Sequence, residues 1–264
     1  GLFQGVFEKE GPAFGLCSCG GRLFFHERLS AAPALILCGG GHVGRKAAAL
    51  GDLCGFAVSV LDDRPEFLAP SDFPKKTRLL CAPFEQGLAA APGGENRYFV
   101  VATRGHLADL ACVREVLKLP FAYLGMIGSK TKVADTLATL RAEGVSQEKL
   151  SAIHAPIGLS IGAQTPAEIA VSIFAEIIAE KSKAGIGEVE EEVLSLLEKG
   201  PRPAVLASVI QKKGSAPRGA GARLVVNETG ILAGTIGGGS VEHAAALRAA
   251  ALLKEAAPAA LADY

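Results

Sequence analysis

The residues with the clearest chemical use are three glycines, Gly39, Gly41 and Gly44, which form the pattern G-x-G-x-x-G. In this pattern the first glycine makes a tight turn, the second lets the backbone approach a pyrophosphate, and the third lets a helix pack closely on a strand. Gly40 and His42 lie inside the same turn, so His42 would meet a ligand at the mouth of the site. The turn predicts a binding site for a phosphate or a nucleotide. The alternative is a domain that keeps these glycines for packing alone.

Two charged residues follow the next largely apolar run, at the distance that dinucleotide-binding folds require. Asp62 comes directly after residues 56–61, where an acidic side chain usually holds a ribose hydroxyl. Such a contact between the acidic side chain and a ribose hydroxyl would favour NAD over NADP as the cofactor. Arg64 comes two residues later, and it either pairs with a phosphate or is an ordinary solvated arginine at the end of a strand.

Further polar residues follow two other apolar runs. Thr103 and His106 come after one of them, and Ser129 comes after another at the start of a predicted helix. Because the carboxyl ends of parallel strands share one edge of a sheet, these side chains are expected beside the glycine turn. Thr103 and Ser129 are candidate contacts to a cofactor, and His106 is a candidate catalytic residue. Asp109, one helical turn further on, either orients His106 or faces solvent.

The elements that position these residues alternate between short apolar runs and longer helical stretches. Residues 34–38 are wholly apolar, as in a central strand that is covered on both faces. Such alternation predicts an α/β class, with a Rossmann-like doubly wound parallel sheet over residues 31–183. Thr165, Pro166 and Glu168 give the last helix a complete start signal. The strands are expected at 34–38, 56–61, 77–81, 97–102 and 121–127, and the helices near 43–54, 84–90, 106–118, 130–143 and 165–181.

The composition changes after a polar linker at residues 181–187, and residues 187–264 predict a small α+β domain. Its three strands and two helices give a thin core for a domain of this size. Ser215 and Arg218 lie in a turn-rich loop of this domain, where Arg218 either meets a phosphate or the first domain, or belongs to a plain surface turn. The helices are expected at 188–198 and 241–256, and the strands at 204–210, 222–226 and 231–235.

A second glycine-rich loop precedes the last of these helices. Gly237, Gly238 and Gly239 offer bare backbone N–H groups at a helix start, which suits an anion. Glu242 lies in the first turn of the helix, where the dipole alone favours an acid. Glu242 is therefore either a ligand contact or a structural cap.

Composition and charge exclude several classes of function. The 264 residues carry 27 basic and 27 acidic side chains, and a formal net charge of zero is not that of a nucleic-acid-binding protein with a basic face. No apolar run approaches the ~20 residues of a membrane-spanning helix. The start of the sequence lacks the pattern of a signal peptide, so neither a membrane nor secretion is expected.

The six cysteines do not form a disulfide framework, and we expect a cytoplasmic protein with reduced thiols. Cys38, Cys54 and Cys112 lie in apolar runs and are expected as small core residues. Cys17 and Cys19 lack a second pair of ligands, so no metal site is predicted.

Several longer motifs make the chain similar to a known family. The sequence resembles the XdhC/CoxI accessory proteins of xanthine dehydrogenase-type molybdenum hydroxylases, with motifs in both predicted domains. In the first domain these are Cys38-Gly-Gly-Gly-His-Val-Gly44, Asp62-Asp-Arg64, Tyr123-Leu-Gly-Met-Ile-Gly-Ser129 and His154-Ala-Pro-Ile-Gly-Leu-Ser-Ile-Gly-Ala163. In the second, CoxI-type domain they are Gly214-Ser-Ala-Pro-Arg218, Gly221-Ala-Arg223 and Gly234-Thr-Ile-Gly-Gly-Gly239 with Glu242.

The resemblance implies a protein that binds molybdenum cofactor, as molybdopterin or its nucleotide form, supports its sulfuration and delivers it to a xanthine dehydrogenase-type molybdenum hydroxylase. It also implies a homodimer and a cysteine desulfurase as a further partner, and it gives Asp62 the nitrogens of a pterin as an alternative to a ribose hydroxyl. Cys19 lies beside two glycines with little apolar cover, so it is the thiol expected to carry the sulfur, since the thiolate is the reactive form. Cys17, two residues away, either forms a strained pair with Cys19 or shares its role.

The order of the domains departs from that of the family, in which the CoxI-type domain comes first. The second domain also stops before the Cys-Gly-Gly and closing strand expected of it, and both stand instead at Cys19-Gly-Gly21 and residues 22–27. We therefore predict a permuted arrangement in which residues 1–30 complete the sheet of the C-terminal domain. The pairing occurs within one chain or by a swap between two chains, and the alternative is a disordered leader.

Two other functions stay open on the sequence alone. An NAD(P)-dependent oxidoreductase would use the same glycine turn, although no proton-transferring set of Ser, Tyr and Lys stands out beside it. A non-catalytic nucleotide-binding regulator would retain its ligand without turnover. The resemblance favours a maturation and insertion chaperone over both of these, and over a hydroxylase.

Overall fold

The chain folds into two compact units. The computed structural model describes residues 14–19, 22–27, 33–92, 94–183, 191–211 and 218–255, together with 260 and 262. One unit spans residues 31–184, and the other combines residues 1–30 with residues 185–264.

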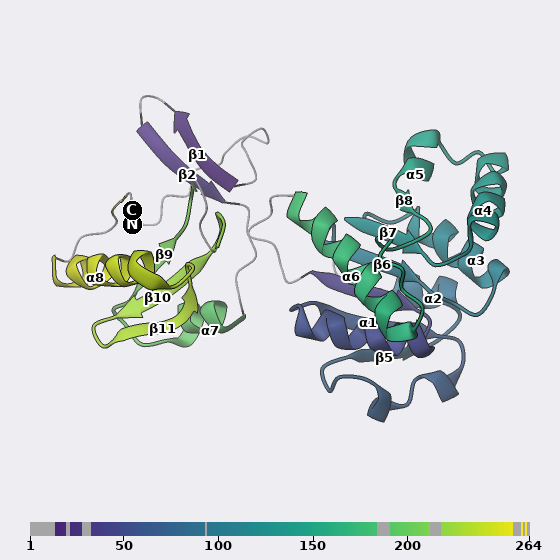
Figure 1. Ribbon diagram of the computed structural model, residues 1–264, viewed down its shortest axis with the longest axis horizontal. Coiled ribbons are helices and arrows are strands. Elements are labelled where there is room, and N and C mark those ends of the chain that lie inside the picture. Colours follow the sequence, from purple (N-terminus) through teal and green to yellow (C-terminus); the bar gives the residue numbers. More distant parts are fainter. Residues whose placement is uncertain are drawn as a thin grey trace. The chain divides into compact units, whose positions relative to one another are not determined.

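The larger unit is built on a six-stranded parallel sheet (Figure 1). The strand order reverses between β3 and β6, which pair in parallel with Ala34 opposite Arg97. This reversal is that of a doubly wound Rossmann fold, so the predicted fold class is confirmed. In sheet order the strands are β5 (Arg78–Cys81), β4 (Ala57–Asp62), β3 (Ala34–Cys38), β6 (Arg97–Val101), β7 (Tyr123–Met126) and β8 (Ile153–His154).

Helices cover both faces of this sheet because alternate strand residues point to opposite sides. On one face, Leu35 and Leu37 pack against α1 (His42–Leu53) and α6 (Pro166–Lys183). On the other face, Ile36 and Cys38 pack against three helices, α2 (Phe84–Ala89), α3 (His106–Val116) and α4 (Lys130–Ala142). Figure 1 shows α1 and α6 side by side on their face. Every residue of β3 is buried, which is why its sequence is apolar throughout. The short α5 (Gln147–Ser151) and β8 were not predicted, because so few residues carry no periodic pattern.

The start of α6 forms as the sequence predicts. The Thr165 hydroxyl accepts from the Glu168 backbone N–H at 3.3 Å, and the Glu168 carboxylate accepts from the Thr165 N–H at 3.1 Å. This reciprocal capping fixes the first turn of the helix. With 18 residues α6 is the longest helix described, and neither it nor any other helix in the described part of the chain is long and apolar enough to cross a membrane.

A polar cluster inside the larger unit ties α6 to the sheet. Glu176 of α6 accepts hydrogen bonds from the Tyr123 hydroxyl at 2.6 Å and the Gly158 backbone N–H at 2.8 Å, and its other oxygen lies 3.3 Å from Nδ1 of His154. Tyr123 is buried, and its ring stacks on that of His154 at 4.6 Å between centroids. Burial of Glu176 opposes ionisation, but these hydrogen bonds outweigh it and lower the pKa of Glu176. The cluster is therefore built around a charged carboxylate.

We expect Glu176→Gln to lower the free energy of unfolding by about 1–2 kcal/mol, since an amide keeps one acceptor and turns a donor toward a neighbouring donor. Glu180→Gln is the matched control, because Glu180 is on the same helix and pairs at the surface with Lys183 at 2.6 Å. Urea unfolding of both variants measures the difference. Equal stability of the two variants would show that the cluster contributes nothing.

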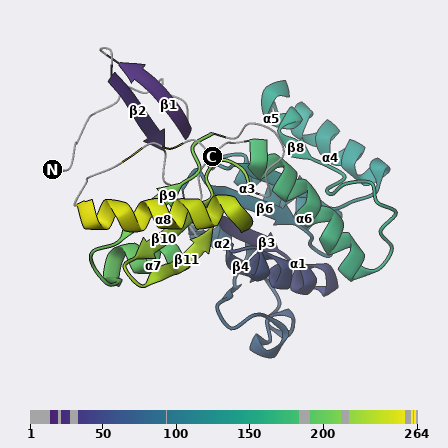
Figure 2. The same cartoon turned by 60° about the vertical axis from the view of Figure 1, so that its left-hand side comes forward.

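The C-terminal part of the other unit contains a small antiparallel sheet with a helix on each face. Its strands lie in the order β11 (Gly230–Thr235), β10 (Arg223–Asn227) and β9 (Val205–Ser208). Leu224 and Val226 pack against α8 (Gly239–Glu255), and Val225 packs on the opposite face with Val193 of α7 (Glu191–Lys199). Figures 1 and 2 both show α8 lying along the sheet. The predicted small α+β domain is therefore confirmed.

Two strands near the start of the chain form a hairpin. β1 (Phe14–Cys19) pairs antiparallel with β2 (Arg22–Glu27), and Cys19 stands opposite Arg22. The strand at residues 22–27 was predicted and β1 was not. Among the described residues β1 pairs with β2 alone, and β9, β10 and β11 pair with one another. Completion of the C-terminal sheet by residues 1–30, within one chain or by a swap, stays a prediction.

Candidate functional site

The candidate site lies at the carboxyl ends of β3, β4 and β6, where the strand order reverses. After β3 the chain turns through Gly39, Gly40 and Gly41 and enters α1 at His42. Gly41 is the N-cap of α1, with an extended backbone (φ −71°, ψ −168°), and no side chain caps the helix. The first N–H groups of a helix have no partner within it, so this helix start is suited to an anion.

Packing within the protein explains three of the four glycines of the turn. Gly39 has a φ of 120°, and a Cβ atom there would collide with a backbone carbonyl oxygen just after β6. A Cβ atom at Gly40 would collide with a carbonyl oxygen of the loop after β4, and one at Gly44 with the carbonyl oxygen of Gly39. A Cβ atom at Gly41 would meet nothing within 4 Å. The space in front of Gly41 is therefore open, as close approach of a phosphate to the backbone requires.

Asp62 is the last residue of β4, and its fully buried carboxylate accepts four hydrogen bonds. Oδ2 accepts from the Gly40 backbone N–H at 2.9 Å and from Arg64 Nη2 at 3.2 Å. Oδ1 accepts from the backbone N–H of Arg64 at 3.1 Å and from its Nε at 3.0 Å. Burial opposes ionisation, but the hydrogen bonds and the charge of Arg64 outweigh it and lower the pKa of Asp62.

These bonds bear on the role predicted for Asp62. A carboxylate offers about four lone-pair positions, and all of them are occupied here. In this structure Asp62 fixes the glycine turn and the guanidinium of Arg64. A contact between Asp62 and a ribose, with the preference for NAD that depends on it, stays a prediction.

Arg64 and Arg104 reach the same place from the two strands that flank β3. The Arg64 guanidinium lies 3.7 Å from the ring centroid of Phe67, in a short 3-10 helix (Pro65–Phe67) after β4. Arg104 follows β6, and its Nη2 lies 3.2 Å from an oxygen of Asp63. Arg104 was not predicted, because the ion pair joins residues that lie far apart in the sequence.

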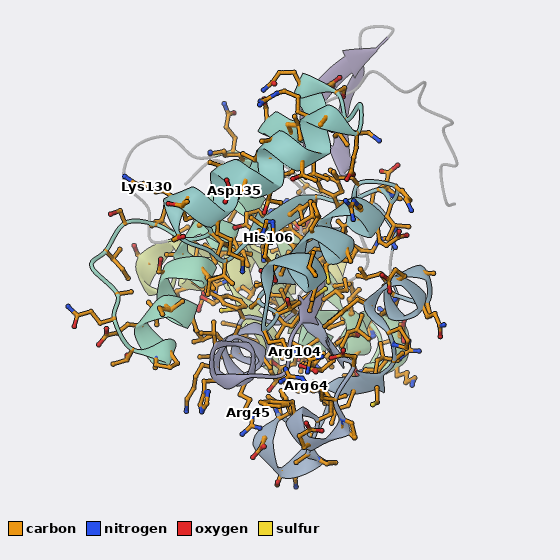
Figure 3. The ribbon with its side chains drawn as sticks, turned by 90° about the vertical axis from the view of Figure 1, so that its right-hand side faces the viewer. Arg45, Arg64, Arg104, His106, Lys130 and Asp135 are labelled. Carbon is orange, nitrogen blue, oxygen red and sulfur yellow. The ribbon has the colours of Figure 1, made fainter. Side chains whose placement is uncertain are left out.

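Arg45 is a third basic residue beside the glycine turn and was also missed. Its Nε donates to the carbonyl oxygen of Gly40 at 3.1 Å, and its Nη1 lies 2.9 Å from Asp72. Figure 3 shows Arg45, Arg64 and Arg104 grouped together. A basic residue in the first turn of a helix opposes the helix dipole, and that unusual placement was a signal in the sequence.

Asp109 is a buried anchor, which corrects both roles considered for it. Its Oδ1 accepts from the backbone N–H of Thr103 at 3.1 Å and from the Thr103 hydroxyl at 2.5 Å. Its Oδ2 accepts from Nζ of Lys132, a residue that the sequence did not single out. Asp109 thus neither faces solvent nor orients His106; it holds Thr103 and Lys132 at the ends of β6 and β7.

The other predicted residues of this edge lie at helix starts. His106 is half-buried, and its Nδ1 lies 3.4 Å from the hydroxyl of Thr136, which donates its own hydrogen to the carbonyl oxygen of Lys132. Because the Thr136 hydroxyl hydrogen goes to Lys132, its oxygen can only accept from an N–H group at Nδ1 of His106. Ser129 is the N-cap of α4 and accepts from the Lys132 backbone N–H at 3.3 Å. His42, the first residue of α1, is exposed.

A carboxylate already fills the second glycine-rich loop. Glu242 accepts from the Thr235 hydroxyl at 2.5 Å and from the backbone N–H groups of Ile236 at 3.0 Å and Gly238 at 3.1 Å. The Gly237 N–H donates to the Thr235 hydroxyl oxygen at 3.1 Å. The hydrogen bond from Thr235, with the backbone bonds, lowers the pKa of Glu242 against a smaller effect of burial. Of the two roles considered for Glu242, the structure shows the structural cap.

The remaining predicted site residues do not belong to the Rossmann unit. Gly239 has a φ of 66° and is the first residue of α8, and Arg218 is exposed. Ser215 lies outside the described residues. Cys19 ends β1, and its side chain is not among those described. The structure thus brings together the candidates between residues 39 and 129, and places those of the second unit in a fold of their own.

Sequence comparison identifies relatives of the chain. A relative from Escherichia coli (strain K12), named "uncharacterized protein YqeB", is 36% identical over 185 residues, which are 69% of this chain and 34% of that protein. One from Bacillus subtilis (strain 168), named as a probable xanthine dehydrogenase subunit, is 33% identical over 162 residues, 61% of this chain and 47% of that protein. The chain thus spans between a third and a half of these curated relatives.

A solved structure shares the fold. The crystal structure of a protein described as a xanthine dehydrogenase from Bacillus halodurans superposes with a TM-score of 0.50 at 23% identity, over 61% of this chain and 45% of that one. The family model described as the XdhC Rossmann domain matches residues 35–177, and that of the XdhC and CoxI family matches residues 197–264. Because the first of these covers more than half of the 264 residues, the chain belongs to the XdhC family.

Proposed function

We propose that this chain is an accessory protein that prepares molybdenum cofactor for a molybdenum hydroxylase of the xanthine dehydrogenase type. Membership of the XdhC family supports this role, and so does the name of the Bacillus subtilis relative. In this role the chain binds the cofactor at the carboxyl edge of its Rossmann sheet. It supports sulfuration of the cofactor together with a cysteine desulfurase, and it delivers the cofactor to the hydroxylase as a cytoplasmic homodimer.

The observation that carries the proposal is the open space at Gly41. Molybdenum cofactor contains a pterin and a phosphate, which a nucleotide extends in some forms, so its site needs anion donors at an accessible place. Gly41 stands at an uncapped helix start where a Cβ atom would meet nothing within 4 Å. Because its φ of −71° suits any residue, neither packing nor backbone conformation demands a glycine there. A ligand that touches the backbone explains it.

The neighbouring side chains suit the rest of such a ligand. When bound, the cofactor supplies the molybdenum and sulfur at which the hydroxylase reacts. The α1 amides would hold the phosphate. Thr103 donates its hydroxyl hydrogen to Asp109, so toward a ligand it acts as an acceptor. Nε2 of His106 is likewise an acceptor, and the two groups match the N–H donors of a pterin.

The first experiment is a cofactor analysis of protein purified from a host that makes molybdenum cofactor. We expect stoichiometric molybdenum and the fluorescence of the released, oxidised pterin, with no affinity for NAD or NADP in parallel titrations. Clear binding of either nicotinamide cofactor without retained pterin would overturn the proposal, and the glycine turn would then belong to an oxidoreductase.

The sulfur-carrying role is tested by Cys19→Ser. We expect this variant to retain the cofactor while activation of apo-hydroxylase falls severalfold, because a hydroxyl cannot carry a sulfur as a thiolate does. Cys17→Ser is the matched control, two residues away in β1. Activity of the hydroxylase after incubation with each variant is the measurement. Full activation by the Cys19 variant would exclude this thiol, and a loss in both variants would show a shared role.

A further inference from the structure

The end of β4 presents a cation where a dinucleotide-binding fold usually presents a free carboxylate. Asp62 occupies the usual acidic position, but all of its acceptor positions are filled. Arg64, two residues on, keeps free bonding capacity. Two of its five N–H donors go to Asp62, and the other three have no acceptor among the residues that the structure describes. The Arg64 side chain is 20% exposed, so part of it lies at the surface of the protein.

Arg64 is held in place before any ligand arrives. Its guanidinium forms two hydrogen bonds to the buried carboxylate of Asp62, and its Cζ lies over the ring of Phe67 at 3.7 Å from the ring centroid. Both contacts restrict the rotamers of a side chain that is otherwise flexible. Binding through this guanidinium therefore loses little further conformational entropy.

A second guanidinium reaches the same place from the other neighbour of β3. Nη2 of Arg104 lies 3.2 Å from Oδ2 of Asp63, and Nε of Arg64 lies 3.7 Å from Oδ1 of the same carboxylate. The two arginines thus approach one partly exposed anion, and Figure 3 labels both of them in the same region. The Asp63 and Arg104 side chains are 35% and 58% exposed, and a pair this exposed is weak. A ligand anion of higher charge can take the place of Asp63.

We propose that Arg64 and Arg104 bind a phosphomonoester group of the ligand in the place between them that Asp63 now holds. The proposal rests on the proposed function in taking this crevice as the cofactor site, and it deepens it by naming the group that the site selects. A phosphomonoester is close to a dianion and has three terminal oxygens, which match the forked donors of arginine. A ribose diol is uncharged and would need the acceptor that Asp62 lacks. The group is either the single phosphate of a pterin cofactor, which the arginines would then hold together with the α1 amides, or a phosphate on a nucleotide ribose, since both present the same dianion.

Two pairs of probes, titrated into the full chain, test the proposal and separate the two sources. One pair is the oxidised fluorescent pterin of molybdenum cofactor before and after phosphatase treatment. The other pair is adenosine 2′,5′-bisphosphate and adenosine 5′-monophosphate. We expect the phosphorylated member of one pair to bind about tenfold more tightly or better, which is the scale of charge-assisted hydrogen bonds. The pair that shows the preference identifies the source.

Three variants and one control distinguish this site from a ribose site. Arg104→Gln should remove most of the preference, whereas Arg78→Gln, which removes the same charge at the amino end of β5, should leave it unchanged. Asp63→Asn should tighten binding of the phosphorylated probe severalfold, because it removes a competing anion. If Asp63 were instead an acceptor for ribose, the same substitution would weaken binding. Arg64→Lys, checked for folding by urea unfolding, keeps the charge but loses the fork and should also reduce the preference.

Several results would overturn the proposal. They are equal affinity within both pairs, no binding of any of the four probes, a preference that survives both Arg104→Gln and Arg64→Lys, or weaker binding after Asp63→Asn. The proposed function is judged separately by the pterin and molybdenum that the purified protein retains. Retained pterin without a phosphate preference would remove only the phosphate site. A preference in the adenosine pair without retained pterin would remove only the proposed function.

Discussion

Gly41→Ala is expected to weaken cofactor binding about 100-fold, or ~2.7 kcal/mol, while the protein folds normally. The added methyl group would stand where a phosphate approaches the start of α1, and forcing such an overlap costs about 1–3 kcal/mol. The folded protein itself has room for it, because a Cβ atom at Gly41 meets nothing within 4 Å and the φ of −71° is open to alanine. The retained pterin and molybdenum per protein, with urea unfolding of the same sample, measure both effects.

Two further glycine variants separate an effect on the ligand from an effect on the fold. Gly94→Ala is the matched control, since a Cβ atom at Gly94 also meets nothing within 4 Å, but Gly94 lies before β6, at the opposite end of the sheet. It should change neither binding nor stability. Gly44→Ala should instead disrupt folding, because its methyl group would collide with the carbonyl oxygen of Gly39. Undiminished cofactor binding by the Gly41 variant would show that no ligand contacts this turn.

Most of the Rossmann unit was predictable because its pattern is local. The apolar run of β3, the glycines after it and the capping residues before α6 each act through near neighbours in the sequence, and each formed as expected. α5 and β8 escaped prediction because five and two residues are too short to show a period. β1 was missed although β2 was found, since its pairing partner rather than its own pattern defines it.

The site was only partly predictable, because sequence gives the positions of polar groups but not which of their bonds are already made. Asp62 and Arg64 lie where expected, yet the Asp62 carboxylate already accepts hydrogen bonds from Gly40 and Arg64. Asp109 was misjudged for the same reason, as its partners are Thr103 in the loop after β6 and Lys132 in the first turn of α4. A buried acid must be paired, and the sequence alone does not identify the partner.

Asp62→Asn is expected to lower the free energy of unfolding by about 3 kcal/mol near neutral pH. The amide keeps one oxygen, and its NH₂ group must face either the Gly40 N–H or the donors of Arg64, so a donor opposes a donor. Removing one partner of a buried ion pair costs about 3–5 kcal/mol, and the partial exposure of Arg64 places this pair at the low end. Asp63→Asn, in the next position and half-exposed, should cost no more than about 0.5 kcal/mol.

The loss of unfolding free energy caused by Asp62→Asn should also depend on pH, and the lowered pKa of Asp62 sets the direction of that dependence. The folded state lowers this pKa below its ordinary value of 3.8, so the charged carboxylate stabilises the fold at higher pH, and this contribution is lost as the pH falls through the folded pKa. The wild-type protein should therefore lose its advantage over Asp62→Asn below the ordinary value, whereas asparagine has no proton to take up. Tyrosine fluorescence follows the Rossmann unit in urea, because Tyr98 and Tyr123 are buried there and the chain has no tryptophan. Two results would show that the buried carboxylate does not hold the glycine turn. One is a difference in unfolding free energy between wild type and Asp62→Asn that stays constant with pH, and the other is an Asp62→Asn variant as stable as Asp63→Asn.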